Sequence, residues 1–134
     1  MSGDGDTRAY ARHEGLSIEE AARRLRYGFL ERTAKAKKCA WILTAHHADD
    51  NAETMLLNLI RGSGSRGLSG IPAIRGNIAR PFLWETRAEL ERYAAARGIP
   101  HVEDETNQDP GAASRNLLRQ RVLPALREIN PRAV

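Results

Sequence analysis

The sequence has a single cysteine and no long apolar run, and each absence excludes a class of protein. Cys39 is the only cysteine among 134 residues, so it cannot form an internal disulfide, which fits a reducing cytoplasm. No apolar run approaches the roughly 20 residues that span a bilayer. The polar start, residues 1–7, lacks the apolar core of a signal peptide. We therefore expect a cytoplasmic protein that does not enter a membrane.

The remaining composition is that of an ordinary globular protein with basic character. Hydrophobic residues make up 41% and charged residues 28%, in a chain long enough for one domain with a core. The net charge is +4, and arginine greatly outnumbers lysine. Arginine pairs with phosphate and stacks on bases, which is compatible with RNA binding. An arginine-rich genome would produce the same bias, so the charge alone decides nothing.

Two histidines and three carboxylates gather where an apolar run ends. Residues 39–44 predict a short buried strand, and residues 51–61 carry apolar side chains at helical spacing. The polar cluster is therefore expected in the turn after a strand and on the first turn of a helix. Open α/β sheets bind ligands at the carboxyl ends of their strands. The candidate catalytic residues are His46, His47, Asp49, Asp50 and Glu53.

The carboxylates of this cluster are also candidate metal ligands. Asp50 and Glu53 are three residues apart, which places them on one face of a helix, and carboxylates suit Mg²⁺. Ordinary capping of a helix N-terminus explains the same spacing. The additional cysteine and histidine ligands of a zinc site are absent, so zinc is not expected.

Two further stretches carry polar groups suited to binding. Glycines in Arg61-Gly62-Ser63-Gly64 let backbone N–H groups approach an anion, but a flexible linker would look the same. The stretch lacks the Gly-Lys-Ser/Thr ending of a P-loop and follows a helix, unlike a Rossmann fingerprint. The acidic stretch 104–109 precedes Arg115 and Asn116, and together they fit either a polar substrate or simple capping.

Strand and helix signals alternate along the chain, which favours an α/β fold with a parallel sheet. Only the strand at 39–44 is well defined, residues 74–80 predict a short turn and strand, and residues 99–102 predict another weak strand. Thr86 as N-cap and Gly98 at the C-terminal end predict a helix over residues 87–97. Pro124 predicts a kink or break in the last helix, which begins near Ser114. The expected organisation is a polar, poorly ordered lead-in (1–16), the second half of a nucleotide-binding α/β domain (17–84) and a helical extension (85–134).

Five motifs follow one another along the chain. They are Ala45-His46-His47-Ala48-Asp49-Asp50-Asn51-Ala52-Glu53-Thr54, Arg61-Gly62-Ser63-Gly64-Ser65-Arg66-Gly67-Leu68, Arg80-Pro81-Phe82-Leu83, Glu103-Asp104-Glu105-Thr106-Asn107 and Arg115-Asn116-Leu117-Leu118-Arg119. In this order they resemble the tRNA(Ile)-lysidine synthetase family of pyrophosphate-loop ATPases. The resemblance covers nearly the whole chain from about Asp6, including the helix that begins after Ser17, and it implies a Rossmann-like, adenine-nucleotide-hydrolase-like fold.

The resemblance implies a two-step reaction that uses ATP and Mg²⁺. The wobble cytidine in the anticodon loop of tRNA(Ile) is adenylated, and the side-chain amine of free lysine then displaces AMP. By analogy, Asp49, Asp50 and Glu53 lie near Mg²⁺ or the lysine ammonium, and His46 and His47 lie near the reacting base or phosphates. The remaining motif residues shape the nucleotide and RNA site, and these are Arg61, Gly62, Ser63, Gly64, Arg115 and Asn116.

One part of the family pattern is missing. The pyrophosphate loop, Ser-Gly-Gly-x-Asp-Ser, resembles residues 2–7 only superficially, because no apolar strand precedes them and Asp4 replaces a glycine. A carboxylate there would repel pyrophosphate. We therefore expect the second part of a catalytic domain, inactive alone, with exposed sheet or helix faces that favour a homodimer.

Three alternatives remain open at this point. A tRNA-thiolating pyrophosphate-loop enzyme shares a His/Asp-rich turn, although such relatives often carry paired cysteines and this chain has one. A non-enzymatic RNA-binding or interaction remnant would keep the scaffold without ATP binding. A metal phosphohydrolase would need further spaced histidines, which the sequence lacks.

Overall fold

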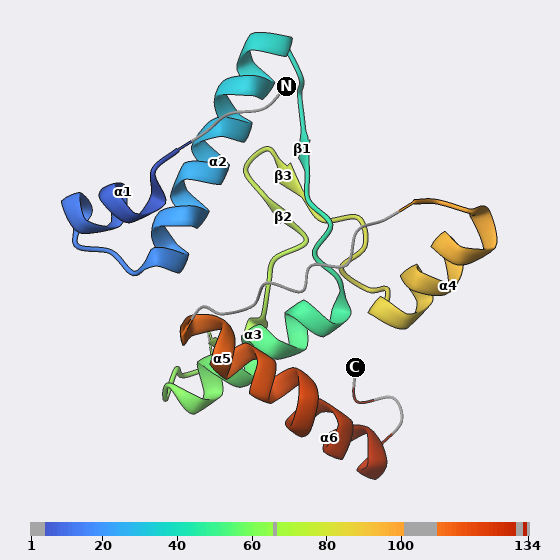
Figure 1. Cartoon of the computed structure of the whole chain (residues 1–134). Helices are drawn as coiled ribbons and strands as arrows, with labels where there is room; N and C mark the ends of the chain where they lie inside the picture. The colour runs from blue at the N-terminus through green and yellow to red at the C-terminus, as the bar shows by residue number, and fades with distance from the viewer. Residues whose placement is uncertain (1–4, 66, 101–109, 131–132, 134) are drawn as a thin grey trace. The chain divides into compact units, whose positions relative to one another are not determined.

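The structure is a computed structural model that describes residues 5–65, 67–100, 110–130 and 133. The chain divides into two compact units, Met1–Ile42 and Leu43–Val134, which are described separately. Figure 1 shows the elements of both in chain order. Among the described residues, no helix combines the length and the apolar character needed to cross a membrane.

The first unit is a pair of packed helices, α1 (Thr7–Glu14) and α2 (Ile18–Lys37). The Asp6 side chain caps α1 by accepting from the N–H of Ala9, and Ser17 caps α2 through the N–H of Glu20. Their small buried residues, Ala11 and Ala21, allow the two backbones to approach closely. Our expectation of a poorly ordered lead-in is therefore wrong for residues 7–14, which form a capped helix.

The second unit is built around a small sheet with strand order β1-β3-β2. β2 (Ile74–Arg75) and β3 (Ile78–Ala79) form an antiparallel hairpin in which Ile74 pairs with Ala79. β1 (Ile42–Leu43) adds to β3, and the N–H of Thr44 donates to the carbonyl of Ala79. The small sheet is mixed, which is consistent with the predicted Rossmann-like α/β fold. Its β2–β3 pair is antiparallel because a short turn at Gly76 can join only antiparallel neighbours.

Helices α3 (Ala48–Ile60) and α4 (Arg87–Arg97) follow the sheet strands. The bounds of α4 match the sequence prediction, because Thr86 and Glu89 form a capping box and Gly98 ends the helix in the left-handed conformation. A short 3₁₀ turn, η1 (Gly67–Ser69), packs on α3.

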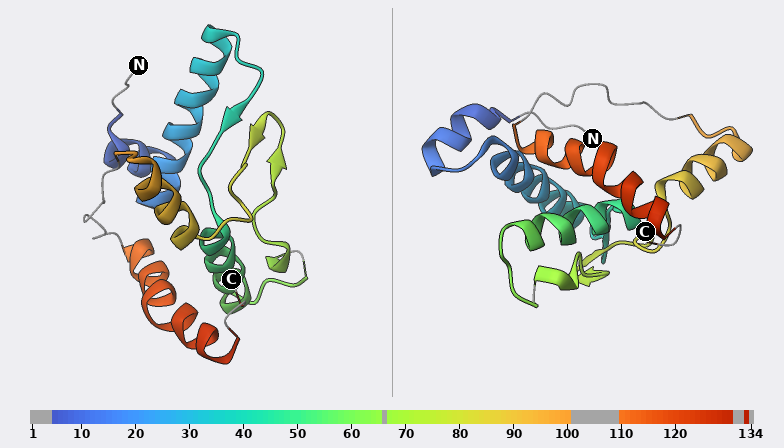
Figure 2. Two further views of the ribbon diagram at one scale, coloured as in Figure 1. Left: turned by 90° about the vertical axis from the view of Figure 1, so that its right-hand side faces the viewer. Right: turned by 90° about the horizontal axis from the view of Figure 1, so that it is seen from below.

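The C-terminal segment is a continuous helical rod of three parts that lies beside α3 (Figures 1 and 2). The parts are α5 (Pro110–Leu117), the π-helical segment η2 (Leu118–Val122) and α6 (Leu123–Ile129). Leu118 and Leu123 are buried. A π turn stands just before Pro124, which has no N–H to donate, and α6 continues from it, so the kink or break expected at Pro124 stays a prediction.

Two sequence predictions fall partly or wholly on residues that lie outside the description. The weak strand expected over 99–102 is not formed at Ile99 and Pro100, and residues 101–102 are not described. The acidic stretch 104–109 also lies outside the described residues. The predicted domain boundaries after residues 16 and 84 stay predictions.

Candidate functional site

The polar cluster begins in the turn between β1 and α3, as the sequence predicted. Thr44 is the last residue paired with β3, and its hydroxyl lies 3.0 Å from Nδ1 of His46. His47 is extended (φ −123°) and acts as the N-cap of α3. Its backbone N–H donates to Oδ2 of Asp50 at 3.1 Å, and its ring Nδ1 faces the N–H of Asp50 at 3.4 Å. His47 and Asp50 therefore form a reciprocal capping box.

Asp49 and Glu53 are the most buried charged side chains of α3 and lie one helical turn apart. Their exposed fractions are 7% and 2%. A carboxylate enclosed to this degree requires hydrogen bonds or a cationic partner, because burial opposes the charged form. Both carboxylates receive such partners from segments far along the chain.

Asp49 joins three elements through one carboxylate. Its Oδ2 accepts from the backbone N–H of Arg87 at 2.8 Å, at the first turn of α4, and its Oδ1 accepts from Nη2 of Arg127 on α6. Burial alone would raise the pKa of Asp49, but the N–H of Arg87, the guanidinium of Arg127 and the nearby His47 outweigh it and lower that pKa. Asp49 is therefore held as a carboxylate.

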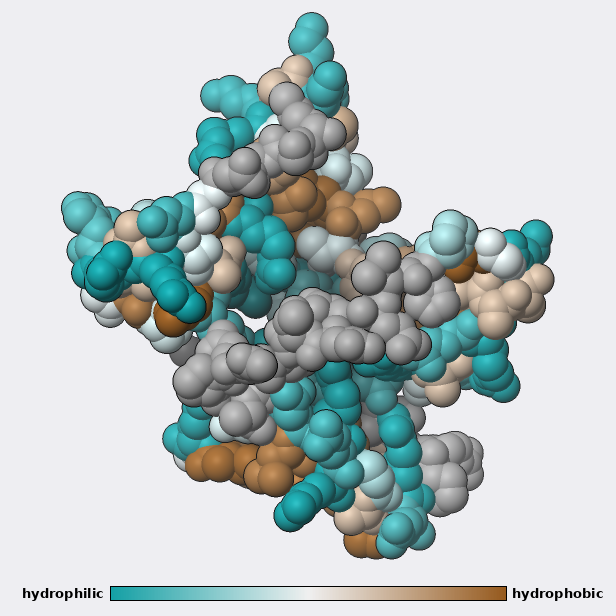
Figure 3. Space-filling view, in the orientation of Figure 1, coloured by the Kyte–Doolittle hydropathy of each residue, from teal (hydrophilic) through white to brown (hydrophobic). Residues whose placement is uncertain are grey.

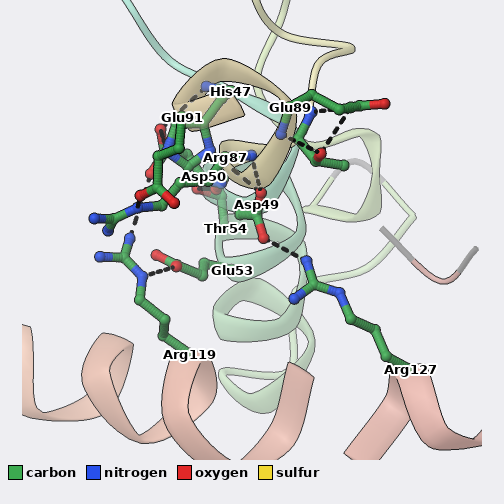
Figure 4. Close-up of polar contacts among 11 residues, drawn as sticks. His47, Asp49, Asp50, Glu53, Thr54, Arg87, Glu89, Glu91, Arg119 and Arg127 are labelled. Carbon is green, nitrogen blue, oxygen red and sulfur yellow. Dashed lines mark hydrogen bonds and ion pairs between the residues drawn. The ribbon is translucent and has the colours of Figure 1, made fainter. Parts of the chain in front are cut away.

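Arg119 pairs with the other two carboxylates (Figure 4). Its Nε donates to Oε1 of Glu53 at 2.7 Å, and its Nη2 lies 3.6 Å from Oδ1 of Asp50. The cluster is thus an alternation of carboxylates on α3 with arginines on the C-terminal rod. The sequence singled out Arg119 as part of a motif, whereas Arg127 and the Arg87 N–H carried no local signal because their partner is 38 to 78 residues away.

The described residues do not fit a Mg²⁺ site built by the protein alone. No group of three His, Cys, Asp or Glu side chains within the described ranges is arranged to hold a metal ion. Arg119 already faces both Asp50 and Glu53 and would repel a second cation there. The assignment of Mg²⁺ to Asp50 and Glu53 therefore gains no support from this geometry and stays a prediction.

The glycine-rich loop lies at the opposite end of α3 from the polar cluster. Arg61 is the C-cap of α3, and Gly62 follows with φ 72°, so the loop leaves the end of a helix of 13 residues, about 20 Å from its start. Ser63 donates its N–H to the carbonyl of Asn58, and the residues of this loop up to Ser65 are exposed. The structure therefore does not bring Arg61, Gly62, Ser63 and Gly64 together with His46 and Glu53.

Arg115 and Asn116 lie on α5, which packs against α3. Arg115 is exposed and Asn116 is half-buried. Their place on the rod that also carries Arg119 puts them on the same element as the cluster's cations.

The described part of the stretch that resembles a pyrophosphate loop has another use. Asp6 caps α1, and its Oδ1 accepts from the N–H of Ala9 at 2.9 Å. A phosphate at this helix start would meet a carboxylate that already occupies the N–H group. The residues present from Gly5 onwards therefore do not fit a phosphate-binding loop.

The fold and the polar turn at the carboxyl end of β1 define an α/β protein of the nucleotide-binding type. A PP-loop domain family model matches residues 4–126, and the chain belongs to that family, whose domain implies the use of ATP.

Relatives of this chain include tRNA(Ile)-lysidine synthases from several bacteria. The chain is 47% identical to that of Porphyromonas gingivalis over 129 residues, which cover 96% of this chain and 28% of the relative. It is 45% identical to that of Thermosipho africanus over 126 residues, 94% of this chain and 29% of the relative. It is 46% identical to that of Parabacteroides distasonis over 130 residues, which cover 97% of this chain and 30% of the relative. The chain thus spans less than a third of the length of these relatives.

Proposed function

We propose that this chain forms part of an ATP-dependent ligase that converts the wobble cytidine of tRNA(Ile) to lysidine. The observation that carries the proposal is the His-His-x-Asp-Asp turn at the carboxyl end of β1, in a chain matched along more than nine-tenths of its length by lysidine synthases. The proposed reaction forms a phosphate ester between the cytidine and AMP with release of pyrophosphate. The amine of free lysine then displaces AMP.

The roles of the residues follow from their chemistry. The carboxylates of Asp50 and Glu53 suit the ammonium group of lysine, which would share them with the Arg119 guanidinium. His46 and His47 precede the positive end of α3, where a phosphate or a base with a developing negative charge is favoured. Arg61 to Gly64 are proposed to meet RNA at the far end of α3.

A chimera tests this proposal with an activity readout. This chain replaces its counterpart in the Porphyromonas gingivalis synthase, and lysidine formation is measured with ATP, lysine and tRNA(Ile). We expect activity that Asp50→Ala reduces by at least 100-fold, since removal of a charged partner at a reacting centre costs about 3 kcal/mol. A folded chimera that binds ATP but forms no lysidine, or an Asp50→Ala variant with unchanged activity, would contradict the proposal.

Calorimetry on the 134-residue chain tests a second part of it. Because Asp6 caps a helix and the loop sequence is absent, the chain alone should bind no ATP. Tight ATP binding by the isolated chain would show that residues outside the polar cluster supply a phosphate site of their own.

A further inference from the structure

The two arginines that face α3 come from positions that a regular helix would turn apart. Arg119 and Arg127 are eight residues apart on the C-terminal rod. At about 100° per residue, eight positions of an α-helix end roughly 80° away from the starting direction. Yet both side chains extend toward α3, Arg119 to Glu53 and Arg127 to Asp49 (Figure 4).

The π-helical segment between them removes this mismatch. Leu123 donates its N–H to the carbonyl of Leu118, five residues back, so one turn holds an additional residue. Eight positions that include this turn rotate about as far as seven α-helical positions, which leaves an offset of roughly 20°. Pro124 has no N–H for the carbonyl of Gln120, so the sequence disfavours an all-α alternative at this point.

Asp49 is the residue through which Arg127 acts on the cluster. The same carboxylate accepts from the N–H of Arg87 at the start of α4, and the neighbouring Ala48 donates its N–H to the carbonyl of Glu85. The starts of α3 and α4 are thus joined at Asp49. Charged or titratable groups near this carboxylate include His47, Arg127 and Glu89, besides Asp50 and Glu53 on α3 itself.

We propose that Arg127 is a positioning residue, which fixes Asp50 and Glu53 by locking the starts of α3 and α4 together through Asp49, and that the π turn sets its register with Arg119. The inference rests on the proposed function only in taking the cluster as the substrate site. Arg119 then holds the carboxylates of Asp50 and Glu53, and Arg127 holds the carboxylate of Asp49, which joins the starts of α3 and α4.

Amide NMR of the 134-residue chain tests the role of Arg127. Arg127→Met keeps the aliphatic stem and removes the charge, so we expect the downfield-displaced amide proton of Arg87 to move upfield, with shifts at Ala48 and Asp50. Arg127→Lys should restore most of the displacement. Arg121→Met, at an exposed arginine of the same rod, is the matched control and should change none of these signals. An Arg87 amide that does not move in Arg127→Met overturns the proposal.

Removal of one residue tests the register. Deletion of Gln120 together with Pro124→Ala permits a continuous α-helix with seven positions from Arg119 to Arg127, whereas Pro124→Ala alone leaves eight. The deletion variant should therefore keep the present offset of roughly 20°, and a regular α-helix in Pro124→Ala should rotate Arg127 by about 100° relative to Arg119. We expect the Arg87 amide to stay near its wild-type position in the deletion variant and to shift in Pro124→Ala as it does in Arg127→Met. An Arg87 amide that shifts in the folded deletion variant, or that stays in place in Pro124→Ala, would overturn the register argument. Neither measurement needs ATP or RNA, so the result stands apart from the chimera's activity.

Discussion

Gly70 is the glycine whose replacement the structure penalises most clearly. Its φ is 68°, and an added Cβ would lie 2.2 Å from Oδ1 of Asn51, the atom that accepts the N–H of Ile71. Gly70→Ala should therefore lower the free energy of unfolding by about 3 kcal/mol, from backbone strain and a lost hydrogen bond. Gly62→Ala has a similar φ of 72° but open space around it, so about 1 kcal/mol is expected. Urea unfolding compares the two, and equal losses would contradict the steric account.

The Glu53–Arg119 pair gives a second prediction at the residue scale. Glu53 is 2% exposed, so Arg119→Met leaves a buried carboxylate without its cation. A wholly buried pair would lose roughly 3–5 kcal/mol. We expect about 2 kcal/mol, because the Arg119 side chain is 36% exposed and partly screened.

A double-mutant cycle separates this pair from general packing. Glu53→Gln in the Arg119→Met background should recover part of the lost stability, since the uncompensated charge is gone. Arg121→Met should change the free energy of unfolding by less than about 0.5 kcal/mol. Additive effects of Glu53→Gln and Arg119→Met would show that the pair is not coupled.

At the scale of elements, Asp49 links helices α3, α4 and α6, and its ionisation makes their association depend on pH. The folded-state pKa of Asp49 is lowered, below the unfolded value of about 4. Ionised Asp49 therefore contributes stability above that pH, and the contribution is lost as pH falls through the folded-state pKa. Asp49→Asn should cost about 2 kcal/mol at pH 7.

The Asp49→Asn variant also tests the direction of this pH dependence. The stability difference between the wild type and Asp49→Asn should narrow as pH falls from 5 to 3, measured by urea unfolding at each pH. Asp50→Asn is a useful comparison, because the Asp50 carboxylate is more exposed than that of Asp49 and lies 3.6 Å from its arginine partner, Arg119. A difference that stays constant or widens toward acid would contradict the assignment of a stabilising carboxylate at Asp49.

The elements that the sequence predicted well are those with local signals. The bounds of α4 follow from Thr86, Glu89 and Gly98, all within or next to the helix. Helix α1 was missed because it has eight residues, one of them buried, and its caps Asp6 and Gly15 resemble loop residues. The antiparallel hairpin was foreseen only as a turn and a strand, since two-residue strands carry no alternation.

The candidate site was predictable in part for the same reason. The order strand, histidines, carboxylates and helix is visible along the chain, and the structure places His46 to Glu53 together. The arginine partners depend on contacts across 66 and 78 residues, for Arg119 and Arg127 respectively. The spacing that aligns them uses a π turn, which neither a period of 3.6 nor one of 3.5 reveals.

At the scale of the whole molecule, exposed apolar residues predict self-association. Leu59, Ile60 and Leu117 are 55%, 70% and 53% exposed, and Figure 3 shows apolar surface over the C-terminal end of α3 and α5. We expect a dimer whose fraction rises with concentration in light scattering, because such a patch favours burial against a second copy. Ile60→Lys should shift the equilibrium toward monomer, and Arg121→Met should not. A wild type that stays monomeric at high concentration would contradict this prediction.

The position of the His47 ring makes its tautomer decide which of two neighbours it can bind. Its Nδ1 lies 3.4 Å from the N–H of Asp50 and 3.6 Å from Oδ2 of Asp49. A bare Nδ1 accepts from Asp50 and caps α3, whereas an Nδ1 that carries a proton turns to the Asp49 carboxylate and leaves the Asp50 N–H without its acceptor. Nδ1 cannot serve both neighbours at once, so the tautomer of the ring decides whether it supports the cap of α3 or the carboxylate that holds α4.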